Sequence, residues 1–164
     1  MTDIPSDTNR HDEAISILER RIDALHARAY KIVERHWNYV REMEGRLPGW
    51  ENKSSLQVRC AAKVGNSIRI DWCGIKWYGS KAKGDRKPIR TYIAKPKGAY
   101  GYTLSKLKAL SKDWEAQKVE ETETQLGDIR REASHLVKAI ISIRNANLAA
   151  TRETPNSGDT NVRQ

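Results

Sequence analysis

The sequence has little cysteine and no long apolar run. Only two of its 164 residues are cysteine, Cys60 and Cys73, and both lie in segments with alternating polarity. Two thiols cannot ligate a structural zinc ion alone and are too few for a disulfide framework. No apolar run approaches the ~20 residues that cross a bilayer, and the first residues do not resemble a signal peptide. We therefore expect a cytoplasmic protein without membrane association, with two small, buried, reduced cysteines.

Acidic residues are scarce where the positive charge is concentrated. Residues 52–112 contain fifteen Lys or Arg and only two acids, Asp71 and Asp85, whereas the rest of the chain contains fifteen Lys or Arg and nineteen Asp or Glu. A metal-dependent nuclease needs clustered carboxylates, which this basic segment lacks. The four histidines lie outside it and have no metal spacing, and no serine or cysteine of this segment has a nearby histidine. We therefore expect no enzymatic activity, no cofactor and no metal.

The length and composition indicate one domain with a thin core. The chain has a mass of 18.7 kDa, 38% hydrophobic and 31% charged residues, and a net charge of +9 that favours polyanionic partners. We expect this domain to span residues 12–150. Residues 1–11 and 151–164 have little to bury and are predicted to be disordered.

Two long segments with a helical period flank the basic segment. Between residues 15 and 43, and again between 119 and 147, apolar residues recur at alternating steps of three and four, which is typical of a coiled-coil seam. We predict helices over 12–45, capped by Asn9 or Asp12, and over 112–149. The two seams are expected to pair as an antiparallel hairpin or as an intermolecular bundle. His36 lies on the first seam and is expected to be a packed, hydrogen-bonded imidazole.

The second helix has an acidic N-terminal half, where the helix dipole favours negative charge. We expect these acids to form a solvated face of the helix. They are Asp113, Glu115, Glu120, Glu121 and Glu123.

Between the helices the hydrophobic period falls to two, which predicts strands. Pairing Val58 with Trp72 and Cys60 with Ile70, around a three-residue turn at 64–66, places the apolar residues of both strands on one face. Gly74 then interrupts the alternation and predicts a bulge. Such a bulge would turn Ile75 and Trp77 inward and leave Lys76 and Tyr78 outside.

A third strand, with Ile89 and Ile93 inward, follows a charged loop. The predicted fold is therefore α+β, with a three-stranded antiparallel sheet within residues 54–95 packed on the two long helices. A short helix at 103–110, capped by Thr103, would turn three leucines inward. These leucines are Leu104, Leu107 and Leu110.

The outer face of this sheet and its long loop are the candidate nucleic-acid interface. Lysine and arginine neutralise phosphates and aromatic rings stack on bases, whereas a merely solvated face would mix acids with bases. The candidates are Arg59, Arg69, Lys76, Tyr78, Arg90 and Tyr92 on the sheet, Lys81, Lys83, Arg86 and Lys87 in the loop, and Lys95 and Lys97 beyond the third strand.

The order of these parts resembles the MobI-like proteins of conjugative plasmids and integrative conjugative elements. The resemblance covers roughly residues 12–145 and is carried by His36-Trp37-Asn38-Tyr39, the segments SIRIDW (67–72), IKWYG (75–79) and RKPIRTYI (86–93), and the acidic second helix. It implies an accessory factor that binds double-stranded DNA at the origin of transfer and helps a separate relaxase, with no chemistry of its own. A looser similarity to the arm-binding domains of phage-type integrases implies a DNA-binding regulator instead.

The alternative from another class is a structural or interaction protein. In that case the helical seams would mediate assembly, for example as a homodimer, and the basic sheet would dock an acidic protein. Competition by duplex DNA distinguishes the two hypotheses, because only a DNA-binding surface should lose its ligand to the duplex.

Overall fold

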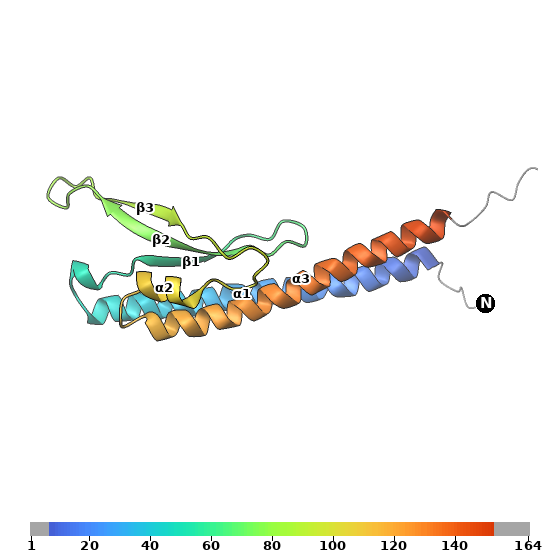
Figure 1. Ribbon diagram of the computed structural model, residues 1–164, viewed down its shortest axis with the longest axis horizontal. Helices are drawn as coiled ribbons and strands as arrows, with labels where there is room; N and C mark the ends of the chain where they lie inside the picture. The colour runs from blue at the N-terminus through green and yellow to red at the C-terminus, as the bar shows by residue number, and fades with distance from the viewer. Residues whose placement is uncertain (1–6, 153–164) are drawn as a thin grey trace, which may run out of the picture.

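The computed structural model describes residues 7–152 and confirms the α+β class (Figure 1). The elements, in chain order, are α1 (Asp7–Arg46), the 3-10 helix η1 (Trp50–Asn52), β1 (Leu56–Cys60), β2 (Ile70–Tyr78), β3 (Lys87–Tyr92), α2 (Leu104–Leu110) and α3 (Ala116–Arg152). None of the helices within the described residues is long and apolar enough to cross a bilayer.

Helices α1 and α3 lie side by side and antiparallel, so that the start of α1 and the end of α3 are at the same end of the molecule (Figure 1). The predicted seams pack against each other within one chain. Ile22 and Leu25 of α1, and Leu126 and Ile129 of α3, are at most 2% exposed. This burial of apolar surface is the main stabilising contribution that such a helix pair has.

The helix ends differ from the predicted ones. Helix α1 begins at Asp7, so residues 7–11 are helical rather than disordered, and Asn9 and Asp12 lie inside the helix instead of capping it. Helix α3 begins only at Ala116, because a turn precedes it in which the Glu115 carboxylate accepts a hydrogen bond of 3.0 Å from the Lys112 backbone N–H. It ends at Arg152, and the rest of the predicted tail, like residues 1–6, lies outside the described residues.

The sheet has the order β1-β2-β3 and is antiparallel throughout. The predicted pairs Val58 with Trp72 and Cys60 with Ile70 are both present. At the tip of the first hairpin, however, Val64 pairs with Ser67, so the turn has two residues instead of three. The two cysteines are free and not opposed, with Cys73 buried and Cys60 half-buried, and burial raises the pKa of both thiols.

The predicted bulge at Gly74 is wrong. Gly74 pairs with Leu56 on one side and Thr91 on the other, in ladders that run without interruption. A Cβ atom at position 74 would collide with the Thr91 hydroxyl, so the glycine leaves room for the Thr91 side chain of the neighbouring strand. A glycine within a strand pattern predicts a bulge, but here the glycine is explained by side-chain packing between two strands.

Trp72 is at the centre of the core, 1% exposed, where the sheet meets both long helices. The imidazole of His36 packs against it edge-on, with ring centroids 5.2 Å apart, and its Nδ1 is 2.9 Å from the Thr122 hydroxyl. Burial lowers the pKa of His36 to about 4, with a smaller contribution from Lys118. The prediction of a packed, hydrogen-bonded histidine is therefore confirmed.

Two of the acids predicted to form a solvated face are buried instead. Glu115 is 0% exposed and accepts a hydrogen bond of 2.7 Å from the Ser54 hydroxyl, and burial raises its pKa. Glu123 is 3% exposed and accepts from the Trp72 indole and the Tyr102 backbone N–H, at 2.6 and 2.7 Å. Glu115 is covered by the segment before β1, and Glu123 by β2 and the loop after β3, which helical periodicity does not reveal.

The carboxylate of Glu123 is paired with the guanidinium of Arg130, about two turns further along the same face of α3, at 2.8 Å. Arg130 also donates to the backbone carbonyls of Ile70 and Tyr100, at 3.2 and 3.0 Å. The pair thereby joins α3 to β2 and to the loop after β3. Helix α2 packs on α3 through the fully buried Leu107, whereas Leu110 is 43% exposed and does not turn inward as predicted.

Candidate nucleic-acid interface

The distal parts of β2 and β3 extend past β1 as a two-stranded ribbon. The β1 ladder reaches Gly74, and beyond it residues 76–78 pair only with residues 87–89. The ribbon and its loop stand clear of the long helices, at the end of the molecule opposite the N-terminus (Figure 1). We call residues 76–90 the basic ribbon, because they contain six Lys or Arg and a single acid, Asp85.

The loop of the basic ribbon is closed by its own hydrogen bonds. Asp85 accepts one of 2.7 Å from the backbone N–H of Ser80, and Gly84 donates one of 3.2 Å to the carbonyl of Lys81. Gly84 has a φ of 66°, which a residue with a side chain rarely adopts. Lys81, Lys83 and Lys87 are exposed, as predicted, the first two on this defined turn and Lys87 at the start of β3.

The two faces of the basic ribbon differ from the predicted ones, because the strand alternation continues through Gly74. Lys76 and Tyr78 share the face of Trp72, and Ile75 and Trp77 lie on the opposite face. The prediction that Lys76 and Tyr78 join the arginines of the outer sheet face is therefore wrong. Both are nevertheless exposed, because the ribbon stands clear of the long helices (Figure 1).

Four residues make up what we call the Tyr78 face of the ribbon. Tyr78 pairs with Lys87, and Lys76 pairs with Ile89. Tyr78 is 53% exposed and Ile89 is 50% exposed. This face therefore combines two cations with two large apolar side chains.

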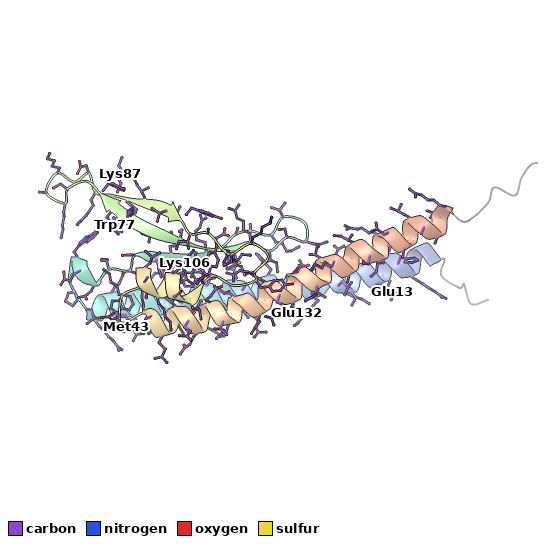
Figure 2. The ribbon with its side chains drawn as sticks, viewed as in Figure 1. Glu13, Met43, Trp77, Lys87, Lys106 and Glu132 are labelled. Atoms are coloured by element: carbon purple, nitrogen blue, oxygen red, sulfur yellow. The ribbon has the colours of Figure 1, made fainter. Side chains whose placement is uncertain are left out.

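The opposite face of the ribbon is closed against η1. The indoles of Trp77 and Trp50 meet edge to face, with centroids 5.1 Å apart, and the guanidinium of Arg86 lies 3.3 Å from the centre of the Trp50 ring. Figure 2 shows Trp77 on the side of the ribbon toward η1 and Lys87 on the outer side. Arg86 is half-buried and not a projecting cation as predicted, and its buried Nε has no hydrogen-bond partner within the described residues.

The outer face of the sheet carries the predicted arginines, each beside an acceptor or an acid. Arg69 forms an ion pair of 2.8 Å with Asp71, which also stands opposite Arg59 in the ladder. Arg90 donates a hydrogen bond of 2.7 Å to the side chain of Gln57. Tyr92 is 87% exposed on the same face. These side chains form a second polar surface that adjoins the basic ribbon at Arg90.

Lys95 and Lys97 are exposed but lie beyond β3 and outside the ribbon. The Lys95 ammonium donates a hydrogen bond of 2.8 Å to the carbonyl of Ala99. Lys95 also lines an open cavity of about 540 Å³ between this loop and α3, together with Tyr100 and Lys138. The structure thus places these two predicted cations apart from the loop lysines.

Three residues of this region were missed by the sequence prediction: Trp50, Trp77 as a surface residue, and Ile89 as a surface residue. Trp50 follows a Leu-Pro-Gly segment and belongs to no periodic pattern, so its aromatic side chain is the only sequence signal that could have indicated a role in this region. Ile89 fits the inward pattern of a half-buried strand, but at its position the sheet has no helix beneath it. An apolar pattern alone does not reveal where the covering layer ends.

The family model described as MobI protein matches residues 25–144. The chain belongs to the MobI family. The match extends from α1 into α3, so it includes the whole sheet and the basic ribbon. Membership makes the chain a mobilization-associated protein of conjugative transfer, as the resemblance implied. Neither a curated protein nor a solved structure matches it.

Proposed function

We propose that this MobI-family protein binds duplex DNA at the origin of transfer and acts there as a non-enzymatic accessory to a relaxase. The observation that carries the proposal is the basic ribbon. It presents Lys76, Lys81, Lys83 and Lys87 on a projecting, hydrogen-bonded hairpin with one acid. The family's association with mobilization supports transfer DNA as the polyanion that this surface would bind.

The shape of the ribbon supports a groove contact. A two-stranded antiparallel ribbon fits into a groove of duplex DNA, and its flanking lysines then reach the phosphates on either side. Phosphate contacts supply affinity and register, whereas side chains that reach base edges in the grooves supply sequence recognition. Arg90 stands where the ribbon joins the outer sheet face, so it is the arginine best placed to add sequence preference to the ribbon's phosphate contacts.

The test is a binding titration of the full chain against random duplex and against intergenic DNA of its own locus. We expect log K to fall with log salt at a slope of roughly −5, since about six phosphate contacts contribute about −0.9 each. Lys81→Ala combined with Lys83→Ala should weaken binding to both DNAs. The matched control, Lys31→Ala combined with Lys106→Ala, removes the same charge from exposed positions on α1 and α2 and should bind normally.

Two results would contradict this function. One is an affinity that does not change with salt. The other is a control variant that loses as much affinity as the ribbon variant, because net charge rather than the ribbon would then explain binding. An acidic protein that duplex DNA fails to displace would instead favour the interaction-protein hypothesis.

A further inference from the structure

Two large apolar side chains stand exposed in the middle of a cationic surface. Tyr78 and Ile89 are 53% and 50% exposed and are diagonal neighbours on the Tyr78 face of the ribbon. Each has a lysine directly opposite it on the other strand, Lys87 for Tyr78 and Lys76 for Ile89. Within the described part of the chain the Tyr78 hydroxyl makes no hydrogen bond that would explain its position.

Phosphate binding alone does not require these two residues. Lysines suffice for phosphate contacts, and exposed apolar surface is unfavourable in water, so the pair indicates an apolar surface on the ligand. In duplex DNA the large apolar surfaces are the faces of the stacked bases. Proteins reach them by inserting apolar side chains between base pairs from the minor groove, which kinks the duplex.

The ribbon is braced for such a contact. An inserted side chain must work against base stacking, so the element that carries it has to resist deflection. Trp77, on the opposite face of the ribbon, packs on Trp50, and the guanidinium of Arg86 at the end of the loop also packs on the Trp50 ring. Trp50 belongs to η1, which follows α1, so this stack couples the projecting ribbon to the helical body.

We propose that Tyr78 and Ile89 form a wedge that enters one base-pair step from the minor groove and kinks the DNA, while Lys76 and Lys87 hold the flanking phosphates. This inference rests on the proposed duplex binding and adds DNA bending to it. The preferred substrate is a duplex with an easily unstacked pyrimidine–purine step. Known wedges of this type kink DNA by about 20–90°, a change large enough to alter how a second protein meets the strands.

The experiment uses the full chain and a duplex of about 20 base pairs whose only pyrimidine–purine step is a central TA. Donor and acceptor dyes at its two ends report bending, and 2-aminopurine in place of the central adenine reports unstacking. The test variant combines Tyr78→Ser with Ile89→Ser. The matched control combines Tyr30→Ser with Ile17→Ser, which have 53% and 51% exposure on α1.

We expect the wild-type protein and the control variant to raise both energy transfer and 2-aminopurine fluorescence at saturation. The wedge variant should lose most of both signals, while its affinity falls by no more than about tenfold because the phosphate contacts remain. Binding by the wild-type protein without a change in energy transfer would overturn the wedge. So would bending without unstacking, since one-sided neutralisation of phosphates would then be its cause.

A protein contact is the competing explanation for the exposed pair, and it predicts a different pattern. The wedge variant would then bend and unstack DNA normally but would fail to support mobilization in mating assays, and this result would overturn the wedge. Failure of the wild-type protein to bind any duplex is distinct from all of these results, because it contradicts the proposed function itself.

Discussion

Glu123 of α3 accepts a hydrogen bond of 2.6 Å from the indole of Trp72, although both side chains are at most 3% exposed. The same carboxylate is paired with Arg130, whose side chain is 8% exposed. A buried charge is tolerated when it is paired and hydrogen-bonded, and this carboxylate has three donors from three segments of the chain. It thereby determines how the sheet that carries the basic ribbon is seated on the helix pair.

Removing the acid from this pair should destabilise the protein strongly. Glu123→Ala leaves the Arg130 guanidinium buried without its partner, and we expect the free energy of unfolding to fall by about 3–5 kcal/mol. Urea titration followed by circular dichroism measures this loss. Glu121→Ala, at an exposed position two residues away, should change it by less than about 0.5 kcal/mol. Similar losses in both variants would contradict the role assigned to Glu123.

His36 should make stability depend on pH between about 6.5 and 4. Its pKa in the folded protein is lowered to about 4, so the unfolded chain binds its proton first as the pH falls. Stability is therefore complete above the unfolded pKa and is lost as the pH falls, by about 3 kcal/mol in total. Urea titrations across this range give the free energies of unfolding of the wild type and of His36→Gln. The two free energies should converge at low pH, and a difference that stays constant with pH would contradict the assignment. The exposed His135→Gln serves as the control.

The helix seams should not tolerate charge. Ile22→Asp and Ile140→Asp replace side chains that are 0% and 1% exposed, and an unpaired carboxylate there should cost several kcal/mol, a large part of a typical ~5–15 kcal/mol stability. Ile17→Asp, at a position 51% exposed on α1, should melt like the wild type. Thermal unfolding followed by circular dichroism compares all three. Unchanged melting of the seam variants would contradict the antiparallel helix pair.

Arg90 should contribute to sequence preference more than Arg69. Arg90→Ala should cost about 1–3 kcal/mol on a preferred site and much less on random duplex. Arg69 is already paired with Asp71, so its substitution should have a smaller effect on either DNA. Fluorescence anisotropy titrations on both DNAs provide the comparison. Equal losses on both DNAs would show that Arg90 only contacts phosphate.

Removing Trp50 should loosen the basic ribbon without unfolding the protein. The indole is 41% exposed and contacts the ribbon through Trp77 and Arg86, away from the helix seams. In Trp50→Ala we expect faster amide hydrogen exchange in residues 76–78 and 87–89, and unchanged protection in α1 and α3. Unchanged exchange in the ribbon would show that the stack does not brace it.

The sequence by itself determined the two long helices, their seams and the register of the first hairpin. Helical seams and strand alternation are local patterns with fixed periods, so Ile22 and Leu126 could be assigned to a buried interface and Val58 to a pair with Trp72. The concentration of positive charge is equally local and marked the loop lysines. The existence of a basic surface was therefore predictable, but its exact faces were not.

Only the tertiary structure decided which residues of the ribbon share a face and which charges are buried. Gly74 leaves room for the Thr91 hydroxyl of the next strand, and without knowledge of that contact its sequence context indicates a bulge. Burial of Glu123 and the stacking of Arg86 on Trp50 each depend on segments that are far apart along the chain. The periodicity of apolar residues predicts which side of a helix or strand faces the neighbouring layer of the fold. Whether a residue on that side is buried depends on how far that neighbouring layer extends.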